Sequence, residues 1–387
     1  MNIKKIIKFL ETEDGKEFFL QLHKEEFSIN KIIALEQKNP DKPIKDLLSL
    51  INIQKKSKLE NSTEFVLTPK GAQQASSTLV AKYHAKRFSG FQTYADLCCG
   101  NGIDLHYISE NKQKAFAVDL DEDTLLAAKY NNRNNLNITF LQMKAEEFPI
   151  EVEAIFIDPD RREGNRRLID PEDLSPRLSD VLKLEKITPN IMMKLSPAMD
   201  YDSLNLSYKH SFEFVSENGE LKEILLCLGD FANLGKRAVL LPQGICLDEN
   251  NQELTVSGIQ KYILEPDPAV IRAGLVQDLG YNLGCDLLDS YLALLSSDHE
   301  IQSEFTKTYE VVDHFDYNLK KLKKYLRQAE IGRLVIKTRG FSQSVEQFRK
   351  KLNLKGNNET IMFIIRIGDG HKIIFANFLR KPLRNKQ

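Results

Sequence analysis

Two acids and two glycines lie close together where a short apolar run of the chain ends. The run ends at Asp96, and the turn that follows contains Gly100 and Gly102. Because glycine has no Cβ, the backbone there can adopt positive φ and approach a ligand closely. A second apolar run ends at Asp119, about 20 residues on, where a carboxylate can accept hydrogen bonds from both hydroxyls of a ribose. This spacing predicts half of a nucleotide-binding βαβ unit.

The turn departs from the dinucleotide-binding pattern G-x-G-x-x-G, because Leu105 stands where the third glycine would be. The acids Asp96 and Asp104 would also repel a pyrophosphate at a helix N-terminus. Acids instead favour a ligand that carries positive charge. The pattern D-x-x-x-G-x-G, followed by an acid at the end of the second strand, resembles the class I methyltransferases, whose S-adenosylmethionine carries an ammonium and a sulfonium. A purely structural turn and a dehydrogenase are the alternatives.

The resemblance implies S-adenosylmethionine as the cofactor and extends to residues around the motif. A helix before the first strand is similar to the segment that closes over the methionine end of the cofactor, which brings in Gln74 and Ser76, although helix capping explains both about as well. The family often holds the adenine amino group with an acid after the third strand, and Glu146 is the nearest candidate. The expected cofactor-binding residues are Gln74, Ser76, Asp96, Cys98, Gly100, Gly102, Asp104, Asp119, Leu120, Glu146 and Asp158.

The fourth apolar run, Ala154–Ile157, leads into Asp158, Pro159 and two arginines. Asp158 is expected to accept a hydrogen bond from an attacking amine, since methyl transfer mainly requires alignment of a nucleophile. Arginine guanidinium groups suit phosphate. The alternative is a strand-end acid paired with its own arginines. The segment lacks the aromatic residue of methyltransferases that stack a flipped base, and looks closer to the D-P-P-R of RNA-modifying methyltransferases. The expected catalytic residues are Asp158, Arg161 and Arg162.

The elements that must position these residues alternate in type. Strand-like runs at 94–98, 115–119, 138–143, 154–158, 191–195 and 211–215 are separated by helix-length segments. This alternation predicts an α/β fold with a mostly parallel, doubly wound sheet, which binds ligands beyond the carboxyl ends of its strands. Asn218-Gly219 predicts a terminal hairpin. The resemblance implies a Rossmann-like sheet of seven strands.

Further matches, in Glu265–Arg272 and Ile336–Gly340, resemble bacterial class I methyltransferases that carry a ferredoxin-like module and a C-terminal THUMP-like domain. A chain of 387 residues is long for one domain. The expected parts are an N-terminal helical region (1–75), the class I methyltransferase domain (76–244), a small ferredoxin-like α+β module (245–308) and a basic THUMP-like domain (309–387).

Positive charge is concentrated near the C-terminus, although the formal net charge is only −1. Twelve Lys or Arg and two acids lie between Leu319 and Lys355. Such an excess favours contact with phosphates, and a solvated charged face is the alternative. THUMP-type domains are associated with RNA modification, so RNA is the expected partner. The expected RNA-binding residues are Lys320, Lys324, Arg333, Lys337 and Arg339.

The composition, 42% hydrophobic and 28% charged, is that of an ordinary globular protein. Five cysteines without a C-x-x-C pair argue against a disulfide framework and a zinc site. From this cysteine usage no metal is expected, and the location is expected to be a reducing cytoplasm. No apolar run reaches the roughly 20 residues of a membrane span, so no membrane partner is expected. The sequence thus predicts a methyltransferase acting on RNA. A small-molecule or protein methyltransferase and a non-catalytic RNA-binding protein remain alternatives.

Overall fold

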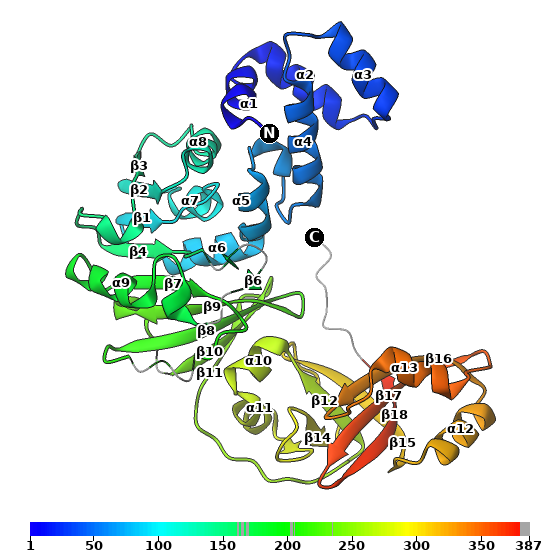
Figure 1. Cartoon of the computed structure of the whole chain (residues 1–387). Helices are drawn as coiled ribbons and strands as arrows, with labels where there is room; N and C mark the ends of the chain where they lie inside the picture. The colour runs from blue at the N-terminus through cyan, green and yellow to red at the C-terminus, as the bar shows by residue number, and fades with distance from the viewer. Residues whose placement is uncertain are drawn as a thin grey trace. The chain divides into compact units, whose positions relative to one another are not determined.

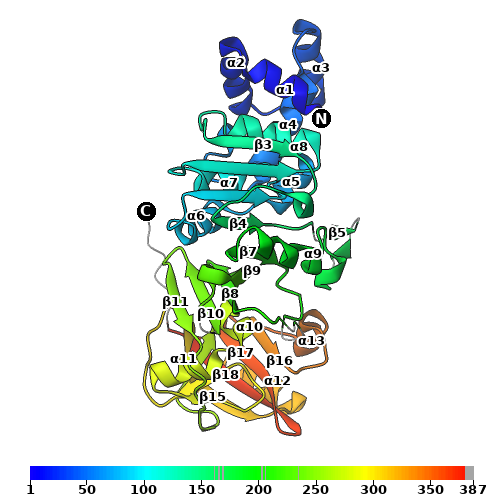
Figure 2. The same cartoon turned by 90° about the vertical axis from the view of Figure 1, so that its left-hand side faces the viewer.

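The computed structural model describes residues 1–160, 162–163, 166–167, 170–201, 204, 206–233 and 235–379. The chain divides into two compact units. The first contains Met1–Gly235 and Leu241–Ile245, and the second contains Lys236–Leu240 and the chain from Cys246 onward. Figures 1 and 2 show the elements of each unit.

The first unit opens with four helices: α1 (Ile3–Leu10), α2 (Glu13–His23), α3 (Ile29–Lys38) and α4 (Ile44–Lys56). The first three begin at capping side chains, since Asn2, Thr12 and Ser28 each accept a hydrogen bond from a backbone N–H three residues on. Their buried apolar side chains form one core with residues of α7 (Ile103–Ile108) and α8 (Glu122–Asn131). The N-terminal helices are therefore packed on the helices that follow the cofactor motif.

A sheet forms the centre of the first unit. Its strands are β1 (Thr93–Leu97), β2 (Lys114–Asp119), β3 (Ile138–Gln142), β4 (Ala154–Ile157), β7 (Ile191–Leu195), β8 (His210–Glu217) and β9 (Glu220–Leu228). They follow the order β8-β9-β7-β4-β1-β2-β3. The strands from β3 to β7 are parallel, and β9 runs antiparallel to both β7 and β8. The sheet also counts β10 (Lys236–Leu241) and β11 (Ile245–Asp248), whose residues are divided between the two units.

This arrangement confirms the predicted doubly wound α/β fold. The predicted hairpin is present, because β8 and β9 are joined at Asn218 and Gly219, which have φ of 53° and 79°. The strand order reverses beside β1, whose neighbours are β2 and β4, and such switch points bind ligands at the carboxyl ends of the strands. Figure 1 shows α6, α7 and α8 along one face of this sheet.

Shorter elements complete the first unit. The helices are α5 (Pro69–Gln74), α6 (Thr78–Arg87) and α9 (Leu178–Leu182), with single turns η1 (Ser62–Glu64), η2 (Ala145–Glu147), η3 (Pro171–Asp173), η4 (Lys183–Lys186) and η5 (Gly229–Phe231). Two short strands, β5 (Arg162–Glu163) and β6 (Arg166–Arg167), pair with each other. Among these elements, α5 and α6 matter most for the site, because the segment between them faces the ends of the central strands.

The second unit has its own sheet of seven strands, in the order β13-β14-β12-β15-β18-β17-β16. The strands are β12 (Tyr262–Pro266), β13 (Asp286–Leu287), β14 (Leu295–Ser297), β15 (Thr306–Asp316), β16 (Ile331–Arg339), β17 (Asn358–Ile367) and β18 (Gly370–Phe378). The helices are α10 (Pro268–Ala273), α11 (Val276–Leu283), α12 (Leu319–Gln328) and α13 (Val345–Leu352).

Side chains alternate between the two faces of this second sheet. Met362 and Ile364 share one core with residues of α12 and α13, whereas Phe363 and Ile365 belong to another core that includes Tyr309. Strands from the expected ferredoxin-like and THUMP-like parts thus form a single sheet. The division of the chain into four parts stays a prediction.

Candidate active site

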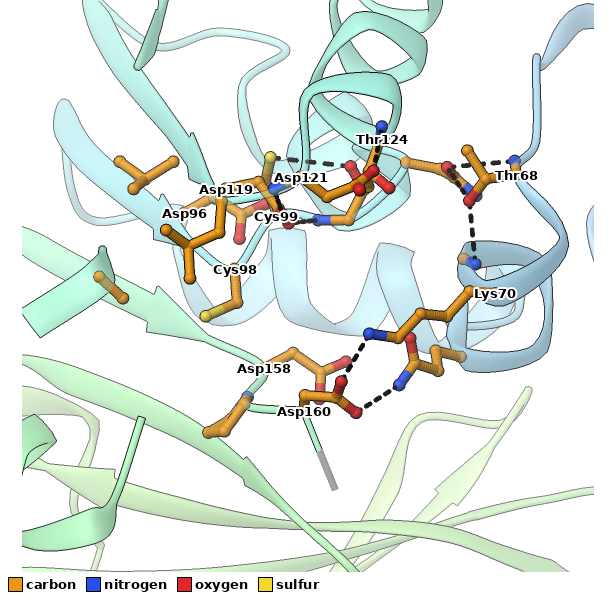
Figure 3. A pocket seen from close by; sticks show the side chains of 18 of the residues that line it. Thr68, Lys70, Asp96, Cys98, Cys99, Asp119, Asp121, Thr124, Asp158 and Asp160 are labelled. Carbon is orange, nitrogen blue, oxygen red and sulfur yellow. Dashed lines mark hydrogen bonds and ion pairs between the residues drawn. The ribbon is translucent and has the colours of Figure 1, made fainter. Parts of the chain in front are cut away.

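A cavity of about 610 Å³ lies at the carboxyl ends of β1, β2 and β4 (Figure 3). This is where a doubly wound sheet is expected to bind its ligand. The predicted cofactor residues that line it are Gln74, Asp96, Cys98, Gly100, Asp104, Asp119, Leu120, Glu146 and Asp158. Segments far apart in the sequence therefore meet at one site.

Two predicted cofactor residues, Gly102 and Ser76, do not line this cavity. Gly102 has a φ of 71°, and a Cβ there would lie 2.7 Å from Asn132 Nδ2 and 3.0 Å from Ala128 Cβ. This glycine allows the turn to pack against α8. Ser76 is buried beside the cavity, where its hydroxyl donates to Asp104 Oδ2 at 2.8 Å.

The turn after β1 is built from residues with positive φ. Cys98 has a φ of 65°, which is uncommon for a residue other than glycine, and Gly100 has a φ of 56°. No atom lies within 4 Å of a Cβ placed at Gly100. The Gly100 amide donates to Asp119 Oδ2 at 3.0 Å, so the turn and the end of β2 are held together. Burial raises the pKa of the Cys98 thiol well above its usual range, which makes this cysteine a poor nucleophile.

Asp119 is fixed at the rim of the cavity by two backbone donors. Besides the Gly100 amide, the Asp121 amide donates to Asp119 Oδ1 at 3.0 Å. Burial raises the pKa of Asp119, and the backbone hydrogen bonds oppose that shift. The carboxylate is thus oriented before a ligand arrives, as contact with a ribose would require.

Asp96 has a buried carboxylate oxygen without a hydrogen-bond partner in the part of the chain that the structure describes. Its side chain is buried, and Oδ2 has no hydrogen-bond partner among the described residues. Burial and the negative charges of Asp104 and Asp158 raise the pKa of Asp96 well above its usual range. A buried acceptor without a partner is costly, and a cationic ligand in the cavity would remove that cost. The site therefore fits S-adenosylmethionine, which carries an ammonium and a sulfonium.

A closed ring of buried polar side chains lies behind the cavity, and the sequence did not reveal it. Lys194 Nζ donates to Ser76 Oγ at 3.1 Å and lies 3.5 Å from Glu223 Oε2. His84 lies between Asp104 and Glu223. Its Nδ1 is 2.7 Å from Asp104 Oδ1, and its Nε2 is 2.6 Å from Glu223 Oε1. The ring thus runs Lys194, Ser76, Asp104, His84, Glu223 and back to Lys194. The one local signal was Lys194, a charged residue inside the apolar run 191–195.

The ring holds its histidine in the charged form. Burial alone would lower the pKa of His84, but the attraction of Glu223 and Asp104 outweighs burial and raises the pKa to about 10. For Asp104, burial is likewise outweighed by the charge and hydrogen bond of His84, which hold its pKa below the usual value. Both ring nitrogens of His84 then act as donors. Asp104 thus reaches the cavity as an ionised carboxylate.

Asp158, the predicted catalytic acid, is bound to this ring. Its Oδ2 accepts from Lys194 Nζ at 2.9 Å. Two residues later, Asp160 holds α5, since it accepts from Lys70 Nζ at 2.6 Å and from Gln74 Nε2 at 3.0 Å (Figure 3). The predicted catalytic residue Arg161 lies outside the described residues, and of Arg162 only the backbone, in β5, is described.

The predicted RNA-binding residues differ in their surroundings. Lys320 and Lys324 are exposed on α12, and Arg333 is exposed on β16 within 3.4 Å of Glu359. Lys337 and Arg339 are half-buried and both bind Glu265 of β12. Their charges are therefore partly compensated within the second unit, whereas those on α12 face solvent. The role of all five in RNA binding stays a prediction.

Within the described parts of the chain, no group of three or more His, Cys, Asp and Glu side chains is arranged to hold a metal ion. Among the residues that the structure describes, every helix is too short or too polar to cross a membrane.

Comparison with known proteins gives matches to both units. The family described as a methyltransferase domain matches residues 95–157, and the THUMP domain-like family matches residues 306–377. Two relatives, from the CDC 1551 / Oshkosh and H37Rv strains of Mycobacterium tuberculosis, are each called an uncharacterized S-adenosylmethionine-dependent methyltransferase. Each is 27% identical over 333 residues, which cover 83% of this chain and 90% of the relative.

A solved protein from Porphyromonas gingivalis W83 has the same fold, with a TM-score of 0.71 and 19% identity over 92% of this chain and 100% of that one. The fold, the cavity and the two family matches define a class I methyltransferase. The chain is an S-adenosylmethionine-dependent methyltransferase with a C-terminal THUMP-like domain.

Proposed function

We propose that the chain transfers the methyl group of S-adenosylmethionine to RNA. The observation that supports this most directly is the basic surface of the THUMP-like domain. On α12, all five basic residues are exposed, while Leu322 and Leu326 are buried against the sheet. On α13, Arg349, Lys350 and Lys351 are exposed as well. Both helices pack on the same face of the second sheet, so their basic side chains share one side of the unit.

The cofactor would be held by residues from three strand ends. When bound, S-adenosylmethionine supplies an electrophilic methyl group on a cationic sulfur. Asp119 would accept hydrogen bonds from the ribose hydroxyls, and Asp96 and Asp104 would face the cationic end. Leu120, Cys98 and Gly100 would complete the contacts at the turn, and Glu146 is the proposed partner of the adenine amino group.

Asp158 would orient the acceptor. Its Oδ2 is fixed by Lys194, and the ring behind Lys194 fixes that ammonium in turn. A carboxylate held in this way can accept a hydrogen bond from an acceptor N–H and take its proton. Arg161 and Arg162 remain proposed contacts of the RNA backbone, and the cytoplasm remains the proposed location.

Calorimetry with S-adenosylmethionine tests the cofactor site. Wild type is expected to bind, and Asp119→Ala is expected to lower the affinity at least tenfold, the equivalent of about 1.4 kcal/mol. Glu122→Ala is the matched control, because Glu122 is an exposed acid three residues away that does not line the cavity. Absent binding by wild type, or equal affinities in wild type and Asp119→Ala, would contradict the assignment.

Labelled methyl transfer to total RNA, followed by mass spectrometry of the nucleosides, tests the substrate. A methylated nucleoside that requires wild-type enzyme supports the proposal. Label in protein or in small molecules alone would make the chain a methyltransferase of another substrate class. RNA binding without any label transfer would make it a non-catalytic RNA-binding protein.

A further inference from the structure

A second cavity of about 330 Å³ adjoins the cofactor cavity. Gln74 and Ala75 line both, so the two cavities meet at the segment between α5 and α6. The wall of the smaller cavity also includes Lys58, Val80 of α6, the end of β7 and the β8–β9 hairpin. Its volume lies at the lower end of the range of small-molecule sites, roughly 300–1,000 Å³.

The wall of the smaller cavity is highly charged. The charged residues that line it are Lys58, Lys194, Lys222, Glu217, Glu220 and Glu223. Lys194 and Glu223 are buried there, with side chains only 4% and 2% exposed. Buried charges are costly to keep unless a structure or a ligand uses them. Several of these groups are paired with each other, since Lys222 binds Glu220 and Lys194 lies 3.5 Å from Glu223. The wall as a whole therefore places hydrogen-bond donors beside acceptors.

Lys194 connects this wall to the reacting centre. It lines the smaller cavity, and its ammonium contacts Asp158, which lines the larger one. The Lys194–Asp158 pair therefore links the walls of the two cavities. A group in the smaller cavity would approach the methyl donor past a carboxylate that Lys194 holds in place.

We propose that the smaller cavity binds the nucleobase to be methylated, an inference that rests on the proposed methylation of RNA. The edge of a nucleobase presents hydrogen-bond donors beside acceptors, as this wall requires. No aromatic side chain is found among the described residues that line the cavity. The base is thus recognised by hydrogen bonds along its edge, one of the two modes by which proteins read unstacked RNA bases.

The chemical step balances with the groups present. An acceptor nitrogen gives its lone pair to the methyl carbon as the carbon–sulfur bond breaks, and the electron pair of that bond stays on sulfur. Asp158 takes the proton that the acceptor nitrogen loses.

The test fills the smaller cavity and leaves the larger one intact. Leu221 of β9 is half-buried and lines only the smaller cavity, so Leu221→Trp places a large side chain there. Leu136→Trp is the matched control, because Leu136 is 92% exposed and lines neither cavity. Each protein is saturated with S-adenosylhomocysteine, and the four ribonucleoside 5′-monophosphates are tested for binding by saturation-transfer NMR.

At least one nucleotide is expected to bind wild type and Leu136→Trp, with the affinity of Leu221→Trp at least tenfold weaker. Lys58→Trp, from an exposed loop on the same cavity, gives the same readout if Leu221→Trp does not fold. The proposal would be overturned if wild type bound no nucleotide, or if Leu221→Trp and Lys58→Trp bound nucleotides with the affinity of wild type.

Two measurements on the same samples separate this proposal from the proposed function. Calorimetry with S-adenosylhomocysteine reports the larger cavity, and its affinity is expected to stay within about twofold of wild type in all variants. If wild type methylates RNA but Leu221→Trp binds nucleotides with the affinity of wild type, only the assignment of the smaller cavity is wrong. If Leu221→Trp binds nucleotides more weakly than wild type but wild type transfers no label to RNA, the proposed methylation of RNA is wrong instead.

Discussion

The ring of Lys194, Ser76, Asp104, His84 and Glu223 determines the charges at the site. Two of its members, Lys194 and His84, are cations, and Asp104 and Glu223 are carboxylates, so their charges cancel within the ring. Removal of one charged member would leave its partners buried without compensation. This explains how an acid-rich cavity can keep Asp104 ionised beside Asp96, whose pKa is strongly raised.

The raised pKa of His84 predicts that stability falls at alkaline pH. The folded protein keeps the His84 proton up to about pH 10, whereas the unfolded chain loses it near the ordinary histidine pKa of 6.5. Between these values the unfolded state binds fewer protons, so the free energy of unfolding decreases as pH rises. Urea unfolding at pH 7 and pH 9.5 measures this decrease.

His84→Gln is the control for the stability experiment, because a glutamine has no proton to lose. Its unfolding midpoint is expected to be lower than that of wild type at pH 7 and to change less between the two pH values. The ionisable groups that face His84 are Asp104 of α7 and Glu223 of β9, and both stay ionised over this range. An equal change in wild type and variant would refute the role of His84.

The residues of the cofactor turn could be predicted because their signal is local. Asp96, Gly100 and Asp119 lie within one βαβ unit, where spacing along the chain fixes spacing in space. The ring could not be predicted, because His84 and Glu223 are 139 positions apart and come together only through the sheet. The motif also predicted a ligand-binding role for Gly102, whereas its φ and its contact with α8 indicate a packing role.

At the scale of elements, α5 is the part of the site held most directly by side chains. Its N-cap Thr68 accepts from the Gly71 amide at 3.0 Å. Lys70, in its first turn, and Gln74, at its last residue, both bind Asp160, in the loop after β4. These contacts link α5 to the loop after β4, and we therefore expect Asp160 to help hold the helix beside the cofactor cavity.

We expect Asp160→Ala to weaken S-adenosylmethionine binding through a faster dissociation rate. The Lys70 side chain is 71% exposed, so the ion pair is screened by solvent and contributes on the order of 0.2–1 kcal/mol. That range corresponds to a loss of affinity of up to roughly fivefold. Stopped-flow displacement measures the rate.

Asp173→Ala serves as the control, because Asp173 is an exposed acid of η3 that does not line the cavity. A dissociation rate in Asp160→Ala equal to that of the control would show that α5 stays in place without Asp160.

The element boundaries of the first unit followed from sequence because strands and helices alternate there with clear periods. The second unit was harder, because its sheet pairs strands across long separations. β12 pairs with β15, and β15 pairs with β18, which lies at the end of the described chain. The boundary expected at residue 309 from the concentration of positive charge falls within β15, and the division into four parts stays a prediction.

At the scale of the whole molecule, the cofactor cavity and the proposed RNA-binding surface belong to different units. The cofactor cavity is formed by the first unit alone, and the basic helices belong to the second. Affinity for RNA and affinity for S-adenosylmethionine should therefore respond to different substitutions.

The double variant Lys320→Gln, Lys324→Gln is expected to weaken RNA binding and leave cofactor affinity unchanged. Each lost contact between a lysine and a phosphate should make the slope of log K for RNA binding against log salt concentration less steep by roughly 0.7–0.9. Filter binding at several salt concentrations measures the slope. Lys31→Gln, Lys38→Gln on α3 removes the same charge from exposed positions of the first unit. The proposed surface would be wrong if both double variants gave the wild-type slope.

The wall shared by the two cavities has a consequence for how each ligand affects the binding of the other. Since Gln74 and Ala75 border both cavities, the donor and the proposed acceptor base would share part of their binding surface. Thermodynamic reciprocity then requires each ligand to change the affinity of the other by the same factor. We expect positive cooperativity between donor and acceptor, and a spent donor that stays bound until the modified base leaves.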